Sequence, residues 1–418
     1  SLLQAANRGV RVRLLLDDNG INHLDTELAL LNTHDNIEVR LFNPFSFRSY
    51  KRIGFLFDLD RLNHRMHNKS FTVDNTITIV GGRNIGDEYF GATDQVLFAD
   101  LDVIAIGEVV TEVSADFDLY WASPLSYPID QLISLKSDQT LDQIAFDQKE
   151  RKNPTRAERY LKVLEQSDLV QNLVNHQPTT SEIMWVKTEM VSDDPVRALG
   201  NQIRPQQLMT YQLQRAIGTP DFKLDLISPY FVPTKTGTQS FALLAQNPNL
   251  QIRILTNSYE ATDVGAVHAG YMKRREDLLK AGIELYELKQ NSSGNLQKVG
   301  KNRFGSSGSS LHAKTFAIDN KRVFVGSFNF DPRSANLNTE LGFVIHSPKL
   351  AKEISGLFDN QIPYESYQLV LNDQGKLHWI ERTQSKEPPI VYNKEPGTHV
   401  LNRLWLKFLS KLPIEWML

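Results

Sequence analysis

The chain contains one motif twice: residues 67–84 read HNKSFTVDNTITIVGGRN, and residues 312–329 read HAKTFAIDNKRVFVGSFN. Both copies follow the same pattern, which is His, any residue, Lys, four residues, Asp, six residues, Gly, Gly or Ser, any residue, Asn. Six positions match at identical spacing in two distant parts of the sequence. Such a match indicates a duplicated unit, so we expect two related halves.

Each copy is expected to form a β-hairpin. Alternation along a strand puts the histidine and the lysine of a copy on one face. The turns should lie at Asp74-Asn75 and Asp319-Asn320, because Asp and Asn tolerate left-handed backbone conformations. The glycines that end the returning strands would let the motif asparagines fold back beside these pairs. The resulting candidate side chains are His67, Lys69 and Asn84 in the first copy and His312, Lys314 and Asn329 in the second.

Two histidines suit the exchange of one phosphodiester for another through a histidine-bound intermediate. One imidazole attacks phosphorus, while the other protonates the leaving alcohol and then deprotonates the incoming one. A single imidazole cannot do both at once, so the two copies should face each other. The lysines and asparagines would hold the non-bridging oxygens, where negative charge develops in the transition state. These phosphate-binding candidates are Lys69, Asn84, Lys314 and Asn329.

Carboxylates supply the other candidates. Asp74 and Asp319 recur in both copies and count with the histidines and lysines as catalytic-motif residues. We interpret them as turn and ion-pair residues, with direct chemistry as the alternative. Asp102 and Glu340 open matching apolar strands after His67 and His312 respectively, and each is the expected partner of the histidine that precedes it. A carboxylate bonded to one imidazole nitrogen would fix the tautomer and aim the other nitrogen. Capping of the strand edges is the alternative role, and Asp100 competes with Asp102.

The repeated motif resembles that of the phospholipase D superfamily, and the flanking phrases resemble its bacterial cardiolipin synthase C branch. Those phrases are GGRNIGDEYF, WVKTEMVSDDP, SLHAKTFAID, GSFNFDPRSANLNTE and LPIEWML. The resemblance covers nearly the whole chain and is weakest across residues 125–180. It implies that His67 is the nucleophile, that His312 is the acid and base, and that the motif aspartates are mostly structural. Gly82 stands where the common pattern has Ser, as at Ser327, which would remove a hydroxyl donor near the phosphate.

Alternating strands and helices predict an α/β fold with a largely parallel or mixed sheet, repeated twice. The resemblance implies that these are two pseudo-symmetric α/β/α sandwich domains of the phospholipase D type, packed face to face. The predicted organisation is a first domain at 1–121, a helix-rich connector at 122–220, a second domain at 221–365 and an amphipathic C-terminal tail at 366–418. The first half has no counterpart of the strand LDLISPYFVP that opens the second. We therefore expect the sequence to begin inside its first domain.

Composition limits the class of protein. A chain of 418 residues can form two or three domains with sizeable cores. The net charge of −3 provides no overall positive field for a nucleic-acid backbone, so nucleic acid is not an expected partner. The chain has no cysteine, which excludes disulfides and thiolate metal sites. No metal or nucleotide motif is recognisable, and an exchange of phosphodiesters needs neither, so no cofactor is predicted.

The substrate prediction depends on the resemblance and on the C-terminal segment. Within residues 398–418 an apolar stripe with helical spacing lies beside basic residues, which is typical of a helix at a membrane interface. The alternative is a helix docked on the protein's own core. The stripe contains Leu401, Leu404, Trp405, Phe408, Leu409 and Leu412, with Arg403, Lys407 and Lys411 beside it. A Gly/Ser-rich loop at 289–310 that carries Lys289, Lys298, Lys301 and Arg303 would suit anionic headgroups, or would be a plain solvated loop.

We therefore expect a cardiolipin synthase that moves a phosphatidyl group from phosphatidylglycerol or phosphatidylethanolamine to phosphatidylglycerol. The alternatives are a phospholipase D that forms phosphatidic acid and, less favoured, a phosphodiesterase nuclease. Phospholipids and the bacterial membrane surface are the expected partners, and the sequence names no protein partner. The expected location is the bacterial inner membrane, with the protein peripheral or anchored through a segment before residue 1.

Overall fold

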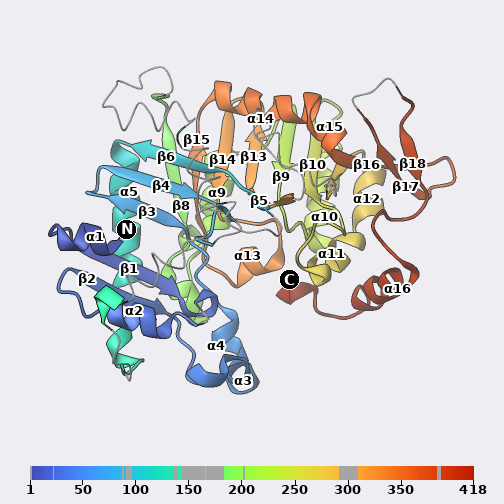
Figure 1. Ribbon diagram of the computed structural model, residues 1–418. Coiled ribbons are helices and arrows are strands. Elements are labelled where there is room, and N and C mark those ends of the chain that lie inside the picture. Colours follow the sequence, from blue (N-terminus) through green and yellow to red (C-terminus); the bar gives the residue numbers. More distant parts are fainter. Residues whose placement is uncertain are drawn as a thin grey trace.

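The structure is a computed structural model that describes residues 2–21, 23–86, 89–90, 97–135, 140–143, 165, 183–200, 203–290, 309–383 and 387–418 (Figure 1). The described strands form a ten-stranded sheet, two three-stranded sheets and a two-stranded pair. Lys298, Lys301 and Arg303 of the predicted basic loop lie outside these ranges, as do parts of the predicted connector. Within them, no helix combines the length and the hydropathy needed to cross a bilayer.

The second half follows the predicted order of strands and helices. Its three leading strands pair in parallel, and the motif hairpin then joins the sheet antiparallel beside the first of them. The elements are β9 (Lys223–Ile227), α10 (Thr234–Leu244), β10 (Gln251–Asn257), α11 (Gly265–Met272), α12 (Arg275–Lys280), β11 (Glu284–Leu288), β13 (Thr315–Ile318), β14 (Arg322–Gly326) and β15 (Leu341–Ile345).

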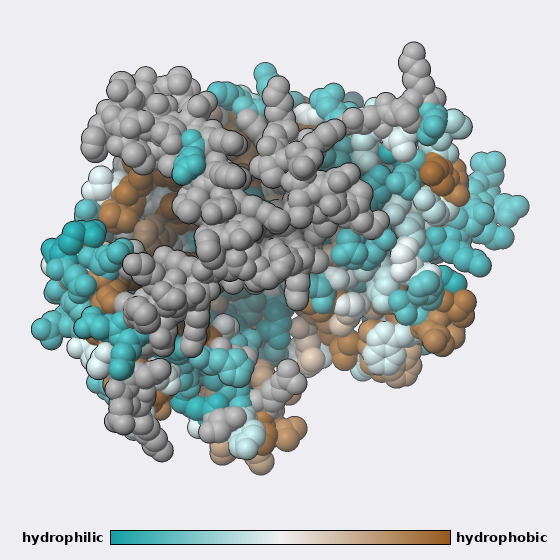
Figure 2. Space-filling model, in the orientation of Figure 1, coloured by the Kyte–Doolittle hydropathy of each residue, from teal (hydrophilic) through white to brown (hydrophobic). Residues whose placement is uncertain are grey.

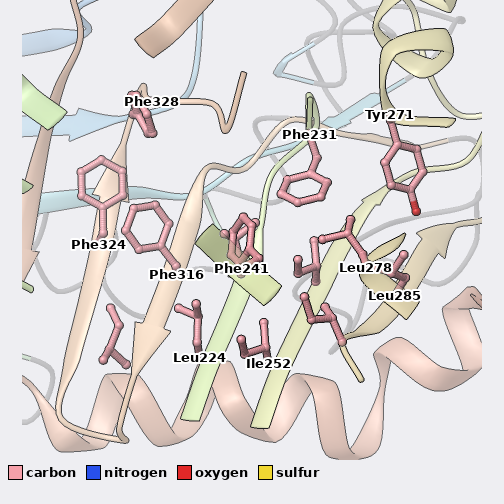
Figure 3. Packing of buried hydrophobic residues seen from close by; sticks show 14 of the residues in the cluster. Leu224, Phe231, Phe241, Ile252, Tyr271, Leu278, Leu285, Phe316, Phe324 and Phe328 are labelled. Atoms are coloured by element: carbon pink, nitrogen blue, oxygen red, sulfur yellow. The ribbon is translucent and has the colours of Figure 1, made fainter. Parts of the chain in front are cut away.

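An apolar layer packs against each face of this sheet. On one face, α10 and α12 cover a cluster rich in aromatic side chains (Figure 3), in which the rings of Phe316 and Phe324 stack with centroids 4.5 Å apart. On the other face, α14 (Pro348–Asn360) packs Ile354 and Phe358 against β-branched and aromatic residues of the same strands. Alternate residues of each strand thus face different layers, which is the pattern of a sheet buried on both sides.

Segments that were expected to be connector and tail extend this sheet at both edges. β8 (Thr188–Ser192) pairs antiparallel with β15, and the described connector also contains α9 (Met209–Ile217). Beyond β11 lie β16 (Ser366–Leu371), β17 (Leu377–Glu381) and β18 (Ile390–Tyr392), before the chain ends in α16 (Val400–Leu409). The predicted divisions near residues 220 and 365 therefore cut through one continuous sheet.

The first half repeats the order with a divided sheet. β1 and β2 pair in parallel and β7 joins them, whereas the hairpin β3–β4 pairs with β6 in a separate sheet. In the second half β9 connects the corresponding parts, and no described residue forms such a strand in the first half. The elements are α1 (Leu2–Asn7), β1 (Val12–Asp17), α2 (Asp25–Leu31), β2 (Ile37–Phe42), α3 (Lys51–Phe57), α4 (Leu59–Asn63), β3 (Ser70–Val73), β4 (Ile77–Gly81), β5 (Leu97–Ala99), β6 (Asp102–Ile106), α5 (Glu108–Trp121) and β7 (Ser126–Pro128).

Candidate active site

Both motif copies form the predicted hairpins. The turn residues Asp74, Asn75, Asp319 and Asn320 all have φ between 50° and 52°, the left-handed values that a two-residue hairpin turn requires. The turns lie at the ends of the hairpins remote from the histidines, so neither motif aspartate is brought to an imidazole. The carboxylate of Asp319 accepts hydrogen bonds from three successive backbone N–H groups at 221–223, which take the place of the predicted ion pair.

The segment that leads into each motif pairs with the backbone of the other half. β12 (Ser309–Leu311) pairs in parallel with β5, and the N–H of His312 donates to the carbonyl of Ala99 at 2.8 Å. At the other motif Met66 forms a parallel bridge with Thr339, and the N–H of His67 donates to the carbonyl of Thr339 at 2.9 Å. The same backbone contact is therefore made twice, once from each half to the other.

A buried carboxylate follows each of these carbonyl groups and contacts the histidine. Oε2 of Glu340 lies 2.8 Å from Nδ1 of His67, and Oδ2 of Asp100 lies 2.6 Å from Nδ1 of His312. Both carboxylate side chains are fully shielded from solvent. A carboxylate at Nδ1 holds the ring in the tautomer whose Nε2 is available for chemistry. Each motif therefore depends on the opposite half for the group that orients its histidine.

The prediction that Asp102 orients a histidine is wrong. Its carboxylate accepts from Nε of Arg83 at 2.6 Å and from the backbone N–H of the same residue. Asp100, which directly follows the carbonyl that holds His312, makes the contact instead. Glu340 does contact a histidine as predicted, but that histidine belongs to the other half. Spacing within one copy could not reveal this exchange, because the contact is made across the interface.

The lysines of the two motifs, one from each half, lie at the same site. Nζ of Lys69 donates to the carbonyl of His67 at 2.7 Å, and Nζ of Lys314 donates to the carbonyl of His312 at 2.6 Å and lies 2.8 Å from its Nδ1. Burial lowers the pKa of Lys69 to about 7 and that of Lys314 to about 8. Burial is also the largest cause of the lowered pKa of both histidines, and the charge of each lysine lowers both further. This mutual influence indicates one shared site rather than two.

The pKa values of the two carboxylates shift in opposite directions, although burial acts to raise both. Burial raises the pKa of Asp100 above its ordinary value. Burial also acts to raise the pKa of Glu340, but the charges of His67 and Lys69 and the hydrogen bonds from His67 and Ser327 outweigh it, so the net shift is downward. Glu340 is therefore held as an anion, which stabilises a positive charge on His67.

A tyrosine that the sequence pattern did not single out lies against Nε2 of His312. The hydroxyl of Tyr89 is 3.2 Å from Nε2 of His312 and accepts from Nδ2 of Asn84 at 2.8 Å. The two rings meet edge to face with centroids 5.0 Å apart. Asn84 thus reaches the site through Tyr89. The phrase GGRNIGDEYF contains Tyr89, but nothing in its spacing from the motif marked it.

The second motif asparagine has spare hydrogen-bonding capacity. Within the described part of the chain, Oδ1 of Asn329 and Oε1 of Glu340 are buried without a hydrogen-bond partner. Buried polar atoms usually find one. Both of these atoms are acceptors, so each can take a hydrogen bond only from a donor such as water or a ligand hydroxyl. The backbone N–H of Asn329 donates to Ser334, which fixes the position of the residue.

Gly82 and Ser327 occupy the same motif position but do different things. The hydroxyl of Ser327 donates to Oε2 of Glu340, so it supports the carboxylate rather than a phosphate, contrary to our expectation. A Cβ at Gly82 would lie 2.4 Å from Oδ1 of Asp100, which is too close for any side chain. Gly82 therefore makes room for the carboxylate that holds His312.

Other charged residues near the motifs have structural contacts. Asp17 accepts from Arg65 and from the backbone N–H of Met66, so it positions the segment that leads into His67. Asp18 is fully buried and accepts from Arg48 and Lys51. Lys289 of the predicted basic loop is paired with Glu381 at 3.0 Å.

Two histidine–carboxylate pairs, crossed between pseudo-symmetric halves and flanked by two lysines, form a candidate site for phosphodiester exchange. A family described as "Cardiolipin synthase, PLD-like domain" matches residues 1–121 and 213–362. Cardiolipin synthase C of Escherichia coli (strain K12) is 46% identical over 418 residues, which cover 100% of this chain and 87% of that protein. An uncharacterized protein of Helicobacter pylori (strain J99) is 33% identical over 99% of this chain and 80% of its own length.

Among solved structures, phosphatidylserine synthase of Haemophilus influenzae Rd KW20 has a TM-score of 0.57 at 14% identity and is matched over 85% of its length by 100% of this chain, which shows a shared fold. The chain belongs to the cardiolipin synthase family with phospholipase D-like domains. The comparisons therefore confirm the fold class and the family that were predicted from the sequence.

Proposed function

We propose that this chain is a cardiolipin synthase, which transfers a phosphatidyl group from phosphatidylglycerol or phosphatidylethanolamine to phosphatidylglycerol. The observation that carries the proposal is the pair of crossed contacts, Glu340 to His67 and Asp100 to His312. They prepare two imidazoles of one site for linked nucleophilic and acid–base work. The similarity to the Escherichia coli enzyme over the whole chain supports the choice of lipid.

In the first step Nε2 of His67 attacks the phosphorus of the donor lipid. The P–N bond forms as the bond from phosphorus to the headgroup oxygen breaks, and Nε2–H of His312 gives its proton to that oxygen. In the second step a hydroxyl of phosphatidylglycerol gives its proton to His312 and attacks the same phosphorus. The P–N bond breaks, and cardiolipin leaves with both histidines restored.

His67 is assigned as the nucleophile because its side chain is the more accessible. It is 26% exposed, whereas the side chain of His312 is 7% exposed and has the hydroxyl of Tyr89 at its Nε2. That hydroxyl stands where the oxygen of a leaving or incoming alcohol would need to be, which suits His312 as acid and base. Lys69 and Lys314 would hold the non-bridging oxygens, and Asn84 and Asn329 would complete their hydrogen bonds.

The electrostatics of the site favour an anionic ligand. The lysines have pKa values near 7 and 8 because both are buried, and the charge of Lys314 lowers the pKa of Lys69 further. A phosphodiester anion between them would offset these charges and raise the pKa of the lysines and of His312. Binding of substrate would thus help to protonate His312, which must act as an acid in the first step.

We also propose that the protein works as a peripheral protein at the bacterial inner membrane, with α16 at the interface. Leu401, Leu404, Trp405 and Phe408 are 53–77% exposed, whereas Leu406 is fully buried and α16 packs against α11. The helix is therefore attached to the protein through one face and presents its predicted apolar stripe to the surroundings. Lys407 and Lys411 are exposed beside that stripe.

Purified protein with labelled phosphatidylglycerol, with and without phosphatidylethanolamine, provides the test. We expect labelled cardiolipin in at least one mixture and none from His67→Ala. Phosphatidic acid without cardiolipin would identify water as the acceptor and the enzyme as a phospholipase D. Release of nucleotides from DNA, lost in His67→Ala, would instead identify a nuclease.

A further inference from the structure

A second apolar surface lies on α3 and the residues beside it. Its side chains, which are 43–80% exposed, are Phe47, Tyr50, Ile53, Leu56, Phe57 and Leu59, and we refer to them as the α3 face. The ring centroids of Phe47 and Phe57 are 6.1 Å apart, so the segment that enters the helix and the end of the helix form one cluster. Clusters of this kind on a water-soluble surface usually mark a contact site.

The orientation of the α3 face is fixed by the inner side of the helix. Phe55 packs edge to face on Phe45 with centroids 5.5 Å apart, and a Cβ at Gly54 would lie only 3.0 Å from Leu62. At the start of the helix Lys51 donates to the carboxylate of Asp18 at 2.8 Å. Because the inner side is closely packed and pinned by this ion pair, the outer apolar residues are held outward.

The α3 face and α16 project on the same side of the molecule. In Figure 1, α3 is the lowest part of the protein and α16 forms its lower right corner, so one flat surface can touch both. Figure 2 shows hydrophobic residues at both places. The two elements are far apart in the sequence, yet each presents exposed aromatic and leucine side chains, such as Phe57 at one and Trp405 at the other.

The charges beside α16 favour an anionic partner. Lys407 and Lys411 are exposed on and just after α16. By contrast, Arg48 and Lys51 beside the α3 face are paired with Asp18. The α3 face therefore offers apolar insertion, while α16 offers both apolar contact and free positive charge. Two separate convex surfaces, one of them basic, suit a flat anionic layer better than a folded protein partner.

We propose that the α3 face is a second membrane-docking site, which inserts Leu56 and Phe57 into an anionic phospholipid bilayer while α16 binds the same bilayer. This docking site rests on the proposed function only for the choice of a lipid surface as the partner. Because α3 and α4 lead directly into the segment that carries His67, docking at two points orients the first motif relative to the bilayer. A single contact through α16 would leave the molecule free to tilt.

Vesicle flotation tests this assignment on a His67→Ala background, so that no turnover changes the lipids. The variants are Leu56→Glu with Phe57→Glu, and Leu404→Glu with Phe408→Glu. Ile390→Glu with Val391→Glu on β18 is the matched control, because these residues are also about half exposed but lie at the upper right of Figure 1. With phosphatidylglycerol vesicles, we expect each of the first two pairs to lower the partition coefficient about tenfold or more, and the control less than about twofold.

Unchanged vesicle binding by the Leu56/Phe57 variant, with an unchanged circular dichroism spectrum, would overturn the assignment. So would a dimer of the background protein in lipid-free ultracentrifugation that this variant abolishes, because the α3 face would then bind a second copy. Cardiolipin formation by the wild-type chain is measured separately with short-chain phosphatidylglycerol below its micelle concentration, with and without short-chain phosphatidylethanolamine. If no cardiolipin forms while binding depends on Leu56 and Phe57, the proposed function fails and the docking site stands.

Discussion

The two motif histidines make the same contact with a carboxylate, but the residues that form and support this contact differ. At one end the longer Glu340 holds His67, and Ser327 donates a hydrogen bond to that carboxylate. At the other end the shorter Asp100 approaches so closely that only a glycine fits at position 82. The imidazole–carboxylate distances are nevertheless 2.8 and 2.6 Å. Pseudo-symmetry therefore preserves the contact to each histidine rather than the identity of the residues around it.

The halves also differ in how firmly their motif hairpins are embedded. A row of three side chains across the first hairpin and β6 is 40–50% exposed, whereas the corresponding row of the second half is at most 4% exposed. The first row is Phe71, Ile79 and Ile104, and the second is Phe316, Phe324 and Val344. The second half thus provides a rigid core, and the crossed contacts at His67 and His312 attach the first half to it.

The largest expected effects follow from removal of either histidine. His67→Ala and His312→Ala should each lower turnover by on the order of 10⁴-fold or more, and the double variant should be little worse, because the two residues act as one unit. Cardiolipin formation measured with labelled lipid provides the check. Partial losses that multiply in the double variant would mean that the two ends work separately.

The next largest losses of turnover are expected from changes to the two orienting carboxylates, and the losses should be similar at both histidines. Glu340→Gln and Asp100→Asn keep the shape but weaken control of the tautomer, so we expect losses on the order of 10³–10⁴-fold in turnover. Asp102→Asn is the matched control, since its carboxylate bonds Arg83, and should cost less than about tenfold. A larger loss for Asp102→Asn than for Asp100→Asn would contradict the crossed arrangement.

A sharper test replaces the Gly82–Asp100 arrangement with the serine–glutamate arrangement that Ser327 and Glu340 form at the other histidine. Gly82→Ser should lower turnover by on the order of 100-fold, because its side chain displaces the carboxylate of Asp100. Adding Asp100→Glu recreates the Ser–Glu arrangement of the other end and should recover a large part of the loss. If the double variant is worse than Gly82→Ser alone, the two ends are not interchangeable in this way.

Affinity for a phosphodiester anion should fall as pH rises from 6 to 9. Lys69 and Lys314, with pKa values near 7 and 8, lose their protons in this range, and each neutral lysine binds the anion less tightly. The expected weakening is up to about tenfold per pH unit for each lysine that titrates. Calorimetry with a soluble phosphodiester, whose own charge is constant here, measures it. Constant affinity in the wild-type chain would contradict the charges assigned to the site.

The smallest effect on chemistry is expected at the motif aspartates. Asp319→Ala removes the acceptor of three backbone N–H groups and should lower the free energy of unfolding by about 1–3 kcal/mol, while Asp74→Ala should cost about 1 kcal/mol, because alanine is disfavoured at its left-handed turn position. Turnover per folded molecule should change less than about tenfold in both. Denaturant unfolding and active-site titration separate the two effects, and a collapse of turnover in a stable Asp319→Ala protein would restore a direct chemical role.

Much of the site was predictable because it lies within the repeated motif. Local alternation fixes the relation of His67 to Lys69, and the Asp-Asn pairs determine the turns. The exchange of Asp100 and Glu340 was not predictable, because it arises from pairing between distant strands. Asp102 lies at the start of β6, where a charged residue is common. The carboxylate that contacts His312 is that of Asp100, because the backbone of His312 is bonded to the preceding carbonyl of Ala99.

The fold was predictable where strands and helices alternate with clear periodicity, as from β9 to β11. The edge strands β8 and β16–β18 were not, because short strands in polar surroundings carry a weak pattern and gain their order from the sheet that they join. Tyr89 was missed for a related reason. A tyrosine beyond a motif has no spacing rule, and only the folded loop brings its hydroxyl to His312.

A crystal structure of the wild-type chain with vanadate tests the central claim most directly. We expect one five-coordinate vanadate bonded to Nε2 of His67, with its opposite apical oxygen within about 3 Å of Nε2 of His312 and Lys69 and Lys314 on its equatorial oxygens. Vanadate bound to His312 instead would reverse the two roles but keep the shared site. Two vanadates in separate cavities, or none at either histidine, would contradict the claim that both halves act on one phosphorus atom.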